Sequence, residues 1–292
     1  MTLDLNGSTI TGNGSRFIAV RRGGKLTIKD ESGNGTITNN SIPLRVIDGG
    51  ELIVESGNIV STGSSAITVG QKTAPGGKVV INGGNIKAQE VCALATYPGA
   101  VIEINGGNLE SVDNFVVGGN GSEGQGETNI VINGGDLTSN ISSAGYVACG
   151  IYHPQKGTLG IHGGNITANN GAGIVVRGGE VTIDGGTITA LGDKDLVGKV
   201  GDSAIQVPTS AVVVDKKAKY YDADNILVTI SNNAEVIGSN SAIAAVVDTD
   251  QTVDGQIEVS GGKFSNDVSE YTSSGYNCVE DTTNQIWEVL PA

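Results

Sequence analysis

Apolar and polar positions alternate with a period of two in short segments along the whole chain, and one block of them repeats. The block is apolar-x-apolar, a polar residue, Gly-Gly, and then x-apolar. Clear copies are centred on the glycine pairs Gly83-Gly84, Gly106-Gly107, Gly134-Gly135, Gly163-Gly164, Gly185-Gly186 and Gly261-Gly262. The shortest spacing between copies is about 22 residues. That length is typical of one coil of a solenoid.

A second block, which is small, Ile, x, apolar, lies between these copies. It occurs at Ala66–Val69, Gly173–Val176, Ala204–Val207 and Ala242–Ala245. Each coil therefore holds three short strands whose alternate residues point inward. The predicted fold is all-β, a single-stranded right-handed parallel β-helix of about ten rungs over residues 1–265. Residues 266–292 leave the repeat, and we predict that they form a C-terminal cap, because an open solenoid end exposes unpaired backbone.

One polar column accompanies the glycine pairs, and it permits two interpretations. Its members are Asn82, Asn105, Asn133, His162 and Asp184. They could form a ligand-binding ladder, or they could be turn residues whose side chains bond to one another from rung to rung. We favour the structural interpretation, because the position is coupled to Gly-Gly in every copy and because Asn and Asp suit tight turns.

The period is broken by insertions, which should protrude from the rod and carry its function. They are Gln71–Pro75, Gly118–Thr128, Leu191–Asp202, Pro208–Asn225 and Asp248–Gly255.

Composition and net charge limit the kinds of partner that the protein is expected to bind. The chain has 46 glycines, and 17 Lys and Arg stand against 31 Asp and Glu, for a formal net charge of −14. Such a surface repels duplex nucleic acid. No apolar run approaches the ~20 residues of a membrane helix, so no membrane insertion is expected. Three cysteines give no disulfide framework, and Cys92 and Cys149 are expected two rungs apart, which is too far for a bridge.

Two segments resemble known proteins. They are Leu3–Ile10 and Ser260–Tyr271, the latter followed by Gly275-Tyr276. The whole chain resembles the right-handed parallel β-helices of the pectate-lyase-like superfamily. In style it is most similar to glycine-rich phage fibre or decoration proteins and to adhesin-like surface proteins of gut bacteria. This resemblance implies a location on a virion, outside the cell or on the cell surface.

Many β-helices of that superfamily cleave polysaccharides, so an enzymatic function is one alternative. Polygalacturonase-like enzymes carry Asn-Thr-Asp, Asp-Asp, Gly-His-Gly and Arg-Ile-Lys elements, and none of the four occurs in this sequence. Hydrolysis needs two carboxyl groups facing one bond, whereas the turn positions offer only Glu55 and Asp184 as isolated acids. No catalytic residue is predicted, although a polysaccharide lyase or glycoside hydrolase remains an alternative.

One acidic turn is a candidate calcium site. Asp248, Asp250 and Asp254 give Asp-x-Asp-x-x-x-Asp-Gly, an oxygen-rich spacing that suits Ca²⁺. The turn lacks the sixth-position glycine and the distant Glu of an EF-hand loop, so a simple solvated turn is the competing interpretation.

Aromatic residues are scarce, and three ring-bearing side chains form a candidate glycan site. Tyr97, Tyr152 and His153 follow the Ile-containing strand on nearby coils. Tyrosines exposed along one side of a rod could stack on pyranose rings. Packing against the adjacent prolines is the alternative.

These observations favour a non-catalytic rod of the phage fibre or decoration type that attaches to a bacterial surface or glycan. No secretory signal is visible before Asp4, and the first rung shows no N-terminal cap. We therefore expect either a homotrimer or another structural protein to cover that rung. The main alternative is a module of a secreted bacterial adhesin, for which this chain would be a trimmed piece of a longer protein.

Overall fold

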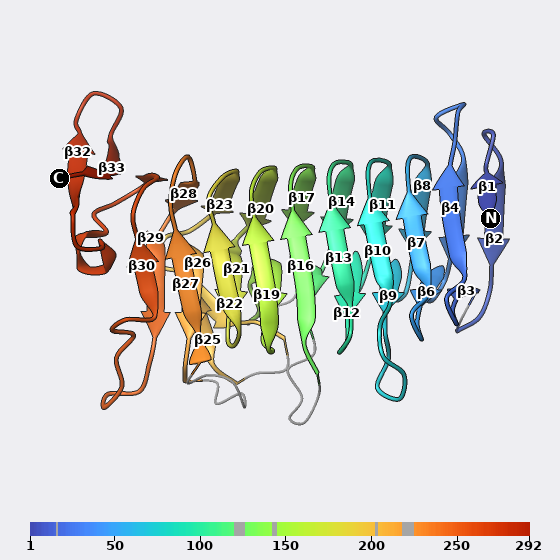
Figure 1. The fold of residues 1–292 in the computed structure, drawn as a ribbon, viewed down its shortest axis with the longest axis horizontal. Helices are drawn as coiled ribbons and strands as arrows, with labels where there is room; N and C mark the ends of the chain where they lie inside the picture. Colours follow the sequence, from blue (N-terminus) through green and yellow to red (C-terminus); the bar gives the residue numbers. More distant parts are fainter. Residues whose placement is uncertain (16, 120–125, 142–144, 202–203, 218–224) are drawn as a thin grey trace.

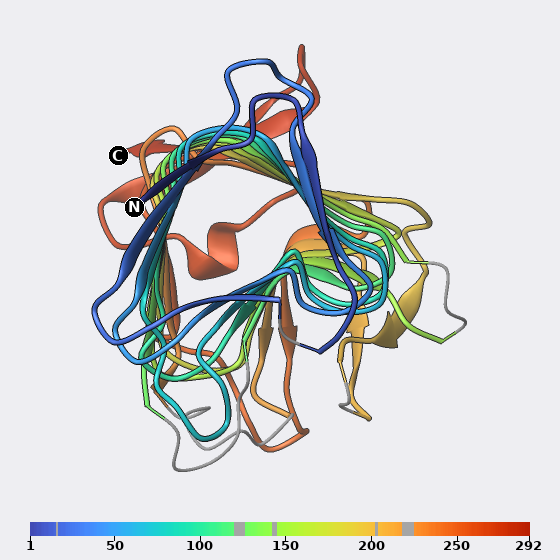
Figure 2. The same cartoon turned by 90° about the vertical axis from the view of Figure 1, so that its right-hand side faces the viewer.

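A computed structural model describes residues 1–15, 17–119, 126–141, 145–201, 204–217 and 225–292. It confirms an all-β parallel solenoid, with about nine turns against the ten predicted (Figure 1). The strands of each turn fall into three long sheets that run the length of the rod. In the view from the end that carries β1, the chain turns clockwise as it recedes, which is the right-handed sense (Figure 2).

The first sheet contains ten parallel strands: β1 (Thr2–Asp4), β4 (Lys25–Lys29), β7 (Glu51–Val54), β10 (Lys78–Ile81), β13 (Val101–Ile104), β16 (Thr128–Ile132), β19 (Gly157–Ile161), β22 (Glu180–Ile183), β27 (Leu227–Ile230) and β30 (Ile257–Val259). The second sheet has twelve strands, of which the last two form an antiparallel hairpin at the C-terminal end. The other ten are parallel, as in the first sheet: β2 (Thr9–Gly12), β5 (Thr36–Asn39), β8 (Asn58–Ser61), β11 (Asn85–Ala88), β14 (Asn108–Ser111), β17 (Asp136–Ser139), β20 (Asn165–Asn169), β23 (Thr187–Leu191), β28 (Glu235–Gly238) and β31 (Lys263–Phe264). The third sheet has nine: β3 (Ile18–Val20), β6 (Leu44–Val46), β9 (Ile67–Val69), β12 (Leu94–Thr96), β15 (Phe115–Gly118), β18 (Ala148–His153), β21 (Gly171–Val176), β26 (Ser210–Asp215) and β29 (Ser241–Val246).

Inward-facing side chains stack in columns and form one continuous core. In the first sheet, register places these core residues in one column: Leu3, Ile28, Val54, Ile81, Ile104, Ile132, Ile161, Ile183, Ile230 and Val259. Each residue packs on its equivalents one turn above and below, so a β-branched side chain meets the same shape on both sides. This repetition explains why Ile and Val dominate the alternating positions.

Each glycine of the pair between the first and second sheets is required for its own steric reason. The second glycine takes a positive φ, for example 89° at Gly84 and 90° at Gly107, which side-chain-bearing residues rarely adopt. The first glycine lies against the turn below, since a Cβ on Gly106 would stand 2.8 Å from the carbonyl oxygen of Asn82. The pair therefore fixes both the bend and the close stacking.

Three members of the polar column beside these glycines form an amide ladder, as its structural interpretation predicts, and the other two, His162 and Asp184, pair with each other over 2.6 Å. Asn133 donates to Asn105 over 2.8 Å, Asn105 donates to Asn82 over 3.0 Å, and Asn82 donates to Glu55 over 3.0 Å. A second ladder joins Asn108, Asn85 and Asn58, one position after the turn. These bonds run along the rod axis and tie each turn to the next.

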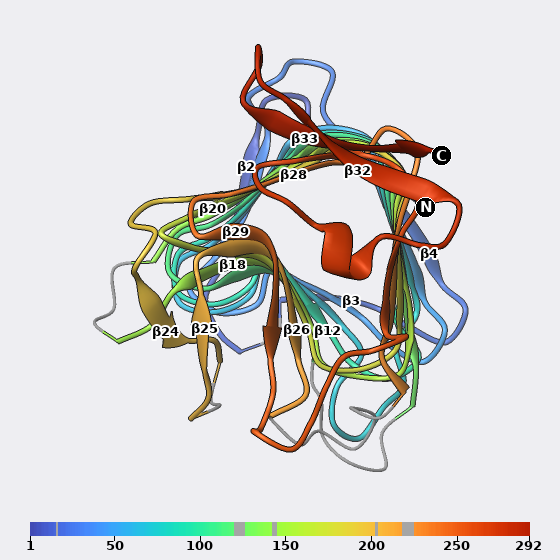
Figure 3. The same cartoon turned by 90° about the vertical axis from the view of Figure 1, so that its left-hand side faces the viewer.

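The C-terminal segment fits a cap. A 3₁₀ turn at Ser269–Tyr271 lies across the end of the core, and the strands β32 (Tyr276–Asp281) and β33 (Ile286–Pro291) form an antiparallel hairpin (Figure 3). Through β33 the hairpin extends the second sheet beyond β31. Within the described residues, no helix is long and apolar enough to cross a membrane.

Two predicted insertions are wrong in detail. Leu191–Asp202 does not simply protrude, because part of it forms β24 (Val197–Lys199), which pairs with β25 (Gln206–Pro208) and packs back on the rod. The predicted strand Ala204–Val207 therefore belongs partly to this hairpin, and the true third-sheet strand is β26, inside the presumed insertion Pro208–Asn225. Residues 120–125, 202–203 and 218–224 of the predicted loops lie outside the described residues.

Candidate functional site

The outer face of the third sheet carries one column of side chains whose size changes abruptly along the rod. Register aligns Ala19, Arg45, Thr68, Ala95, Gly118, Tyr152, Val175, Val213 and Ala244. Three consecutive members are small, and a large side chain stands at each end of the three. Arg45 and Tyr152 are four turns apart, or about 19 Å at roughly 4.8 Å per turn.

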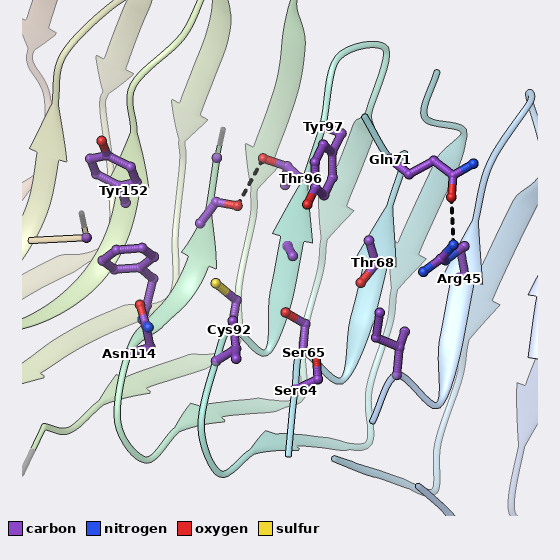
Figure 4. Close-up of a pocket in the computed structure, with 17 residues that line it drawn as sticks. Arg45, Ser64, Ser65, Thr68, Gln71, Cys92, Thr96, Tyr97, Asn114 and Tyr152 are labelled. Atoms are coloured by element: carbon purple, nitrogen blue, oxygen red, sulfur yellow. Dashed lines mark hydrogen bonds between the residues drawn. The ribbon is translucent and has the colours of Figure 1, made fainter. Parts of the chain in front are cut away.

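The small residues form the floor of a groove of about 600 Å³ (Figure 4). One wall comes from the loops that lead from the second sheet into the strands of the third sheet. It includes Ser64, Ser65, Cys92 and Asn114. The opposite wall comes from the loops that follow the third-sheet strands, and it includes Gln71 and Tyr97. A hollow of this size is typical of small-molecule and oligosaccharide sites.

The groove differs electrostatically from the rest of this acidic protein. Among its described lining residues Arg45 is the one charged side chain, and the others are hydroxyl, amide, thiol, aromatic, aliphatic or glycine. The Arg45 guanidinium donates through Nη1 to the Gln71 side-chain oxygen over 2.6 Å, which fixes both side chains at that end. Burial raises the pKa of the Cys92 thiol to about 12, so this thiol is neutral at physiological pH.

Aromatic stacking closes the other end of the groove. The rings of Phe115 and Tyr152 stack with centroids 4.8 Å apart. Behind them, Arg177 donates through Nη1 to the Tyr152 hydroxyl over 2.9 Å and through Nε to the Asp215 carboxylate over 2.7 Å. Burial alone would lower the pKa of Arg177, but Tyr152 and Asp215 raise it overall. The guanidinium therefore stays charged and holds Tyr152 in place.

The β24–β25 hairpin explains why this ion pair is buried on the outside of the sheet. Val200 and Val207 from the hairpin pack against Tyr152, Val175 and Val213, and they form a second, smaller core. Strands β18, β21 and β26 are consequently buried on both faces. The groove lies where this cover ends and the sheet face opens.

Only part of the predicted tyrosine site lies on the surface. Tyr97 is half-buried and lines the groove, as does the edge of Tyr152, but Tyr152 is only 6% exposed. His153 is 1% exposed and shares its register position with the core residue Val176. Successive residues in a strand point to opposite faces, so Tyr152 and His153 cannot both face one ligand. The expectation that Tyr152 is exposed is wrong, because the hairpin covers it.

The predicted calcium turn is not assembled as a metal site. The Asp248 carboxylate lies 3.6 Å from the Lys217 ammonium, and Asp250 and Asp254 are exposed. No group of three or more His, Cys, Asp or Glu side chains that could hold a metal occurs among the described residues. The solvated-turn interpretation fits this geometry better, since a cation already faces one of the three carboxylates.

Sequence reasoning missed most of the groove. Arg45, Ser65, Gln71 and Asn114 come from three different turns of the solenoid, and no local motif connects them. One signal was present: the outward position in the third strand of successive rungs reads Thr68, Ala95 and Gly118, a run of small residues. The signal becomes visible only once the strands are aligned in register.

No family model matches the chain, and no curated protein and no solved structure matches it either.

Proposed function

We propose that the protein is a non-catalytic surface rod whose third-sheet groove holds an extended glycan of a bacterial surface. The observation that carries the proposal is the floor of Thr68, Ala95 and Gly118, bounded by Arg45 and by the Phe115–Tyr152 stack. This floor is long, shallow and free of bulky side chains, so a linear polymer can lie along the rod axis.

The chemistry of the walls suits sugar recognition. Hydroxyl and amide groups of Ser64, Ser65, Gln71 and Asn114 can exchange hydrogen bonds with sugar hydroxyls, and the Tyr97 ring can cover an apolar sugar face. The spacing of turns, about 4.8 Å, is close to the length of one sugar unit in an extended chain. Successive units would therefore meet equivalent positions on successive turns.

The virion setting is part of the same proposal. It rests on the resemblance of Leu3–Ile10 and Ser260–Tyr271 to fibre and adhesin-like proteins. A rigid rod with a lateral groove suits a virion fibre and a bacterial adhesin alike, since in both it presents its binding face away from the structure that anchors it.

The test is a binding screen against bacterial surface polysaccharides and their oligosaccharides. Ala95→Leu fills the middle of the floor, and Thr167→Leu makes a matched change on the outer face of the second sheet. We expect at least one glycan to bind the native chain and the Thr167→Leu variant, and Ala95→Leu to weaken its binding by roughly tenfold or more. Binding that Ala95→Leu leaves intact would exclude the groove.

The same screen measures release of reducing or unsaturated ends. Cleavage of any polysaccharide would contradict the non-catalytic part of the proposal. Failure of every glycan to bind would contradict the proposal as a whole.

A further inference from the structure

Among the residues that the structure describes, the second sheet ends at each end of the rod in a strand with one neighbour. Its terminal strands are β2 and β32. On β2, the Ser8 carbonyl accepts from the Thr36 amide, so that residue faces β5. Backbone groups alternate sides along a strand, which directs those of Thr9 and Thr11 away from β5, toward the open edge.

The edge of β32 can be assigned in the same way. The Ala292 amide donates to the Gly275 carbonyl, so the backbone groups of Gly275, Asn277 and Val279 face β33. Those of Tyr276, Cys278 and Glu280 therefore face outward. Two antiparallel steps separate β31 from β32, and β32 consequently runs in the same direction as β2 and the other parallel strands.

Apolar side chains at the two ends are incompletely covered. The half-buried members of the core include Leu3, Ile10 and Ile18 at one end. At the other end they include Tyr271, Tyr276, Cys278 and Trp287. Removal of these surfaces from water would stabilise a contact between the ends.

The ends also carry opposite charge. Residues 1–24 contain three Arg and one Asp, whereas residues 266–292 contain five Asp or Glu and neither Lys nor Arg. Arg21 and Arg22 are exposed at the first end, and Glu270 and Glu280 are exposed at the second. Ends of like kind therefore repel each other, and unlike ends attract.

We propose that copies of this chain associate head to tail, with β32 of one copy pairing in parallel with β2 of the next. The occupant of each end is thus a second copy, and the second sheet continues across the junction. Unlike a two-fold contact, a head-to-tail contact leaves one free end of each kind, so the assembly grows with concentration. This inference is independent of glycan binding by the groove.

Proline variants test each edge without breaking the internal ladder. Thr11→Pro and Glu280→Pro each remove one outward-facing N–H, a position where an edge strand tolerates proline. Thr11→Val and Glu280→Ala keep that N–H and serve as controls. Sedimentation velocity over a range of protein concentrations reports the assembly, and far-UV circular dichroism shows that each variant is folded.

We expect the native chain and both controls to form concentration-dependent oligomers that high salt weakens. Each proline variant alone should be monomeric. A mixture of the two should stop at dimers, because each variant retains the one face that the other has lost. A native chain that stays monomeric at all concentrations would overturn the proposal. So would proline variants that assemble like the native chain, or a closed trimer that forms through the sides of the rod.

Discussion

The Arg177 guanidinium and the Asp215 carboxylate form a hydrogen-bonded ion pair over 2.7 Å with both side chains fully buried. The two residues come from turns separated by an insertion, and the pair lies under the hairpin that this insertion forms. Because Arg177 also bonds to Tyr152, the pair fixes the aromatic end of the groove.

Loss of one partner of this pair should be far more harmful than loss of both. Asp215→Ala leaves a buried, uncompensated cation, and we expect it to lower the free energy of unfolding by about 3–5 kcal/mol. The double variant Arg177→Met/Asp215→Leu should recover most of that loss, since apolar side chains of similar size suit the second core. Urea denaturation measures both, and equal losses would show that the charge is not the cause.

Replacement of the two groove tyrosines should have different effects, one on glycan affinity and the other on the stability of the fold. Tyr97→Ala removes a half-buried ring from the groove wall, so glycan affinity should fall by roughly tenfold with little change in the melting temperature. Tyr152→Ala removes a buried ring and the bond to Arg177, and unfolding should become easier by about 3 kcal/mol or more. Calorimetric titration and thermal melting distinguish the two effects. The assignment fails if Tyr97→Ala binds normally.

The amide ladder should contribute measurably to stability. Asn105 donates to Asn82 and to Glu103 and accepts from Asn133, so Asn105→Ala removes three exposed hydrogen bonds. We expect a loss of about 1 kcal/mol in the free energy of unfolding. Asn34→Ala, a change at an exposed asparagine outside both ladders, is the control and should have no effect. A ligand role for the column would instead show as lost binding with unchanged stability.

Asp30 should make the first turns sensitive to acid. Its carboxylate accepts from the Gly7 amide over 2.7 Å and from the Gly35 amide over 2.6 Å. The bond from Gly7, with those from Gly35 and Ser32, holds the pKa of Asp30 below its ordinary value of 3.8 against the opposing effect of burial. Because the pKa of Asp30 is lower in the folded state than in the unfolded state, its ionised form stabilises the fold at pH values above the ordinary pKa. The contribution is lost as the pH falls through the folded-state pKa.

Replacement of the Asp30 carboxylate tests the direction of this pH dependence of stability. Asp30→Asn should unfold more easily at neutral pH and should lose less stability than the native chain between about pH 5 and about pH 2. Asp250→Asn, at an exposed turn position, should leave the native pH profile unchanged. Parallel profiles for Asp30→Asn and the native chain would contradict the argument.

The fold was predictable because its determinants are local. Each Gly-Gly pair sets a bend within a few residues, and the alternation beside it shows which side chains enter the core. The groove depends on long-range register instead. Tyr152 aligns with Ala95, and no local pattern reveals that alignment, because the turn between them varies in length. The hairpin that buries Tyr152 was equally hidden, since β25 repeats the apolar pattern of a rung strand.

An experimental structure of the complex would show whether a glycan lies along the floor of the third sheet. The oligosaccharide that binds most tightly in the screen would be used at a saturating concentration. We expect sugar rings that run parallel to the rod axis over Thr68, Ala95 and Gly118, with Tyr97 against one ring. A sugar bound at any other face, with the groove empty, would contradict the proposal.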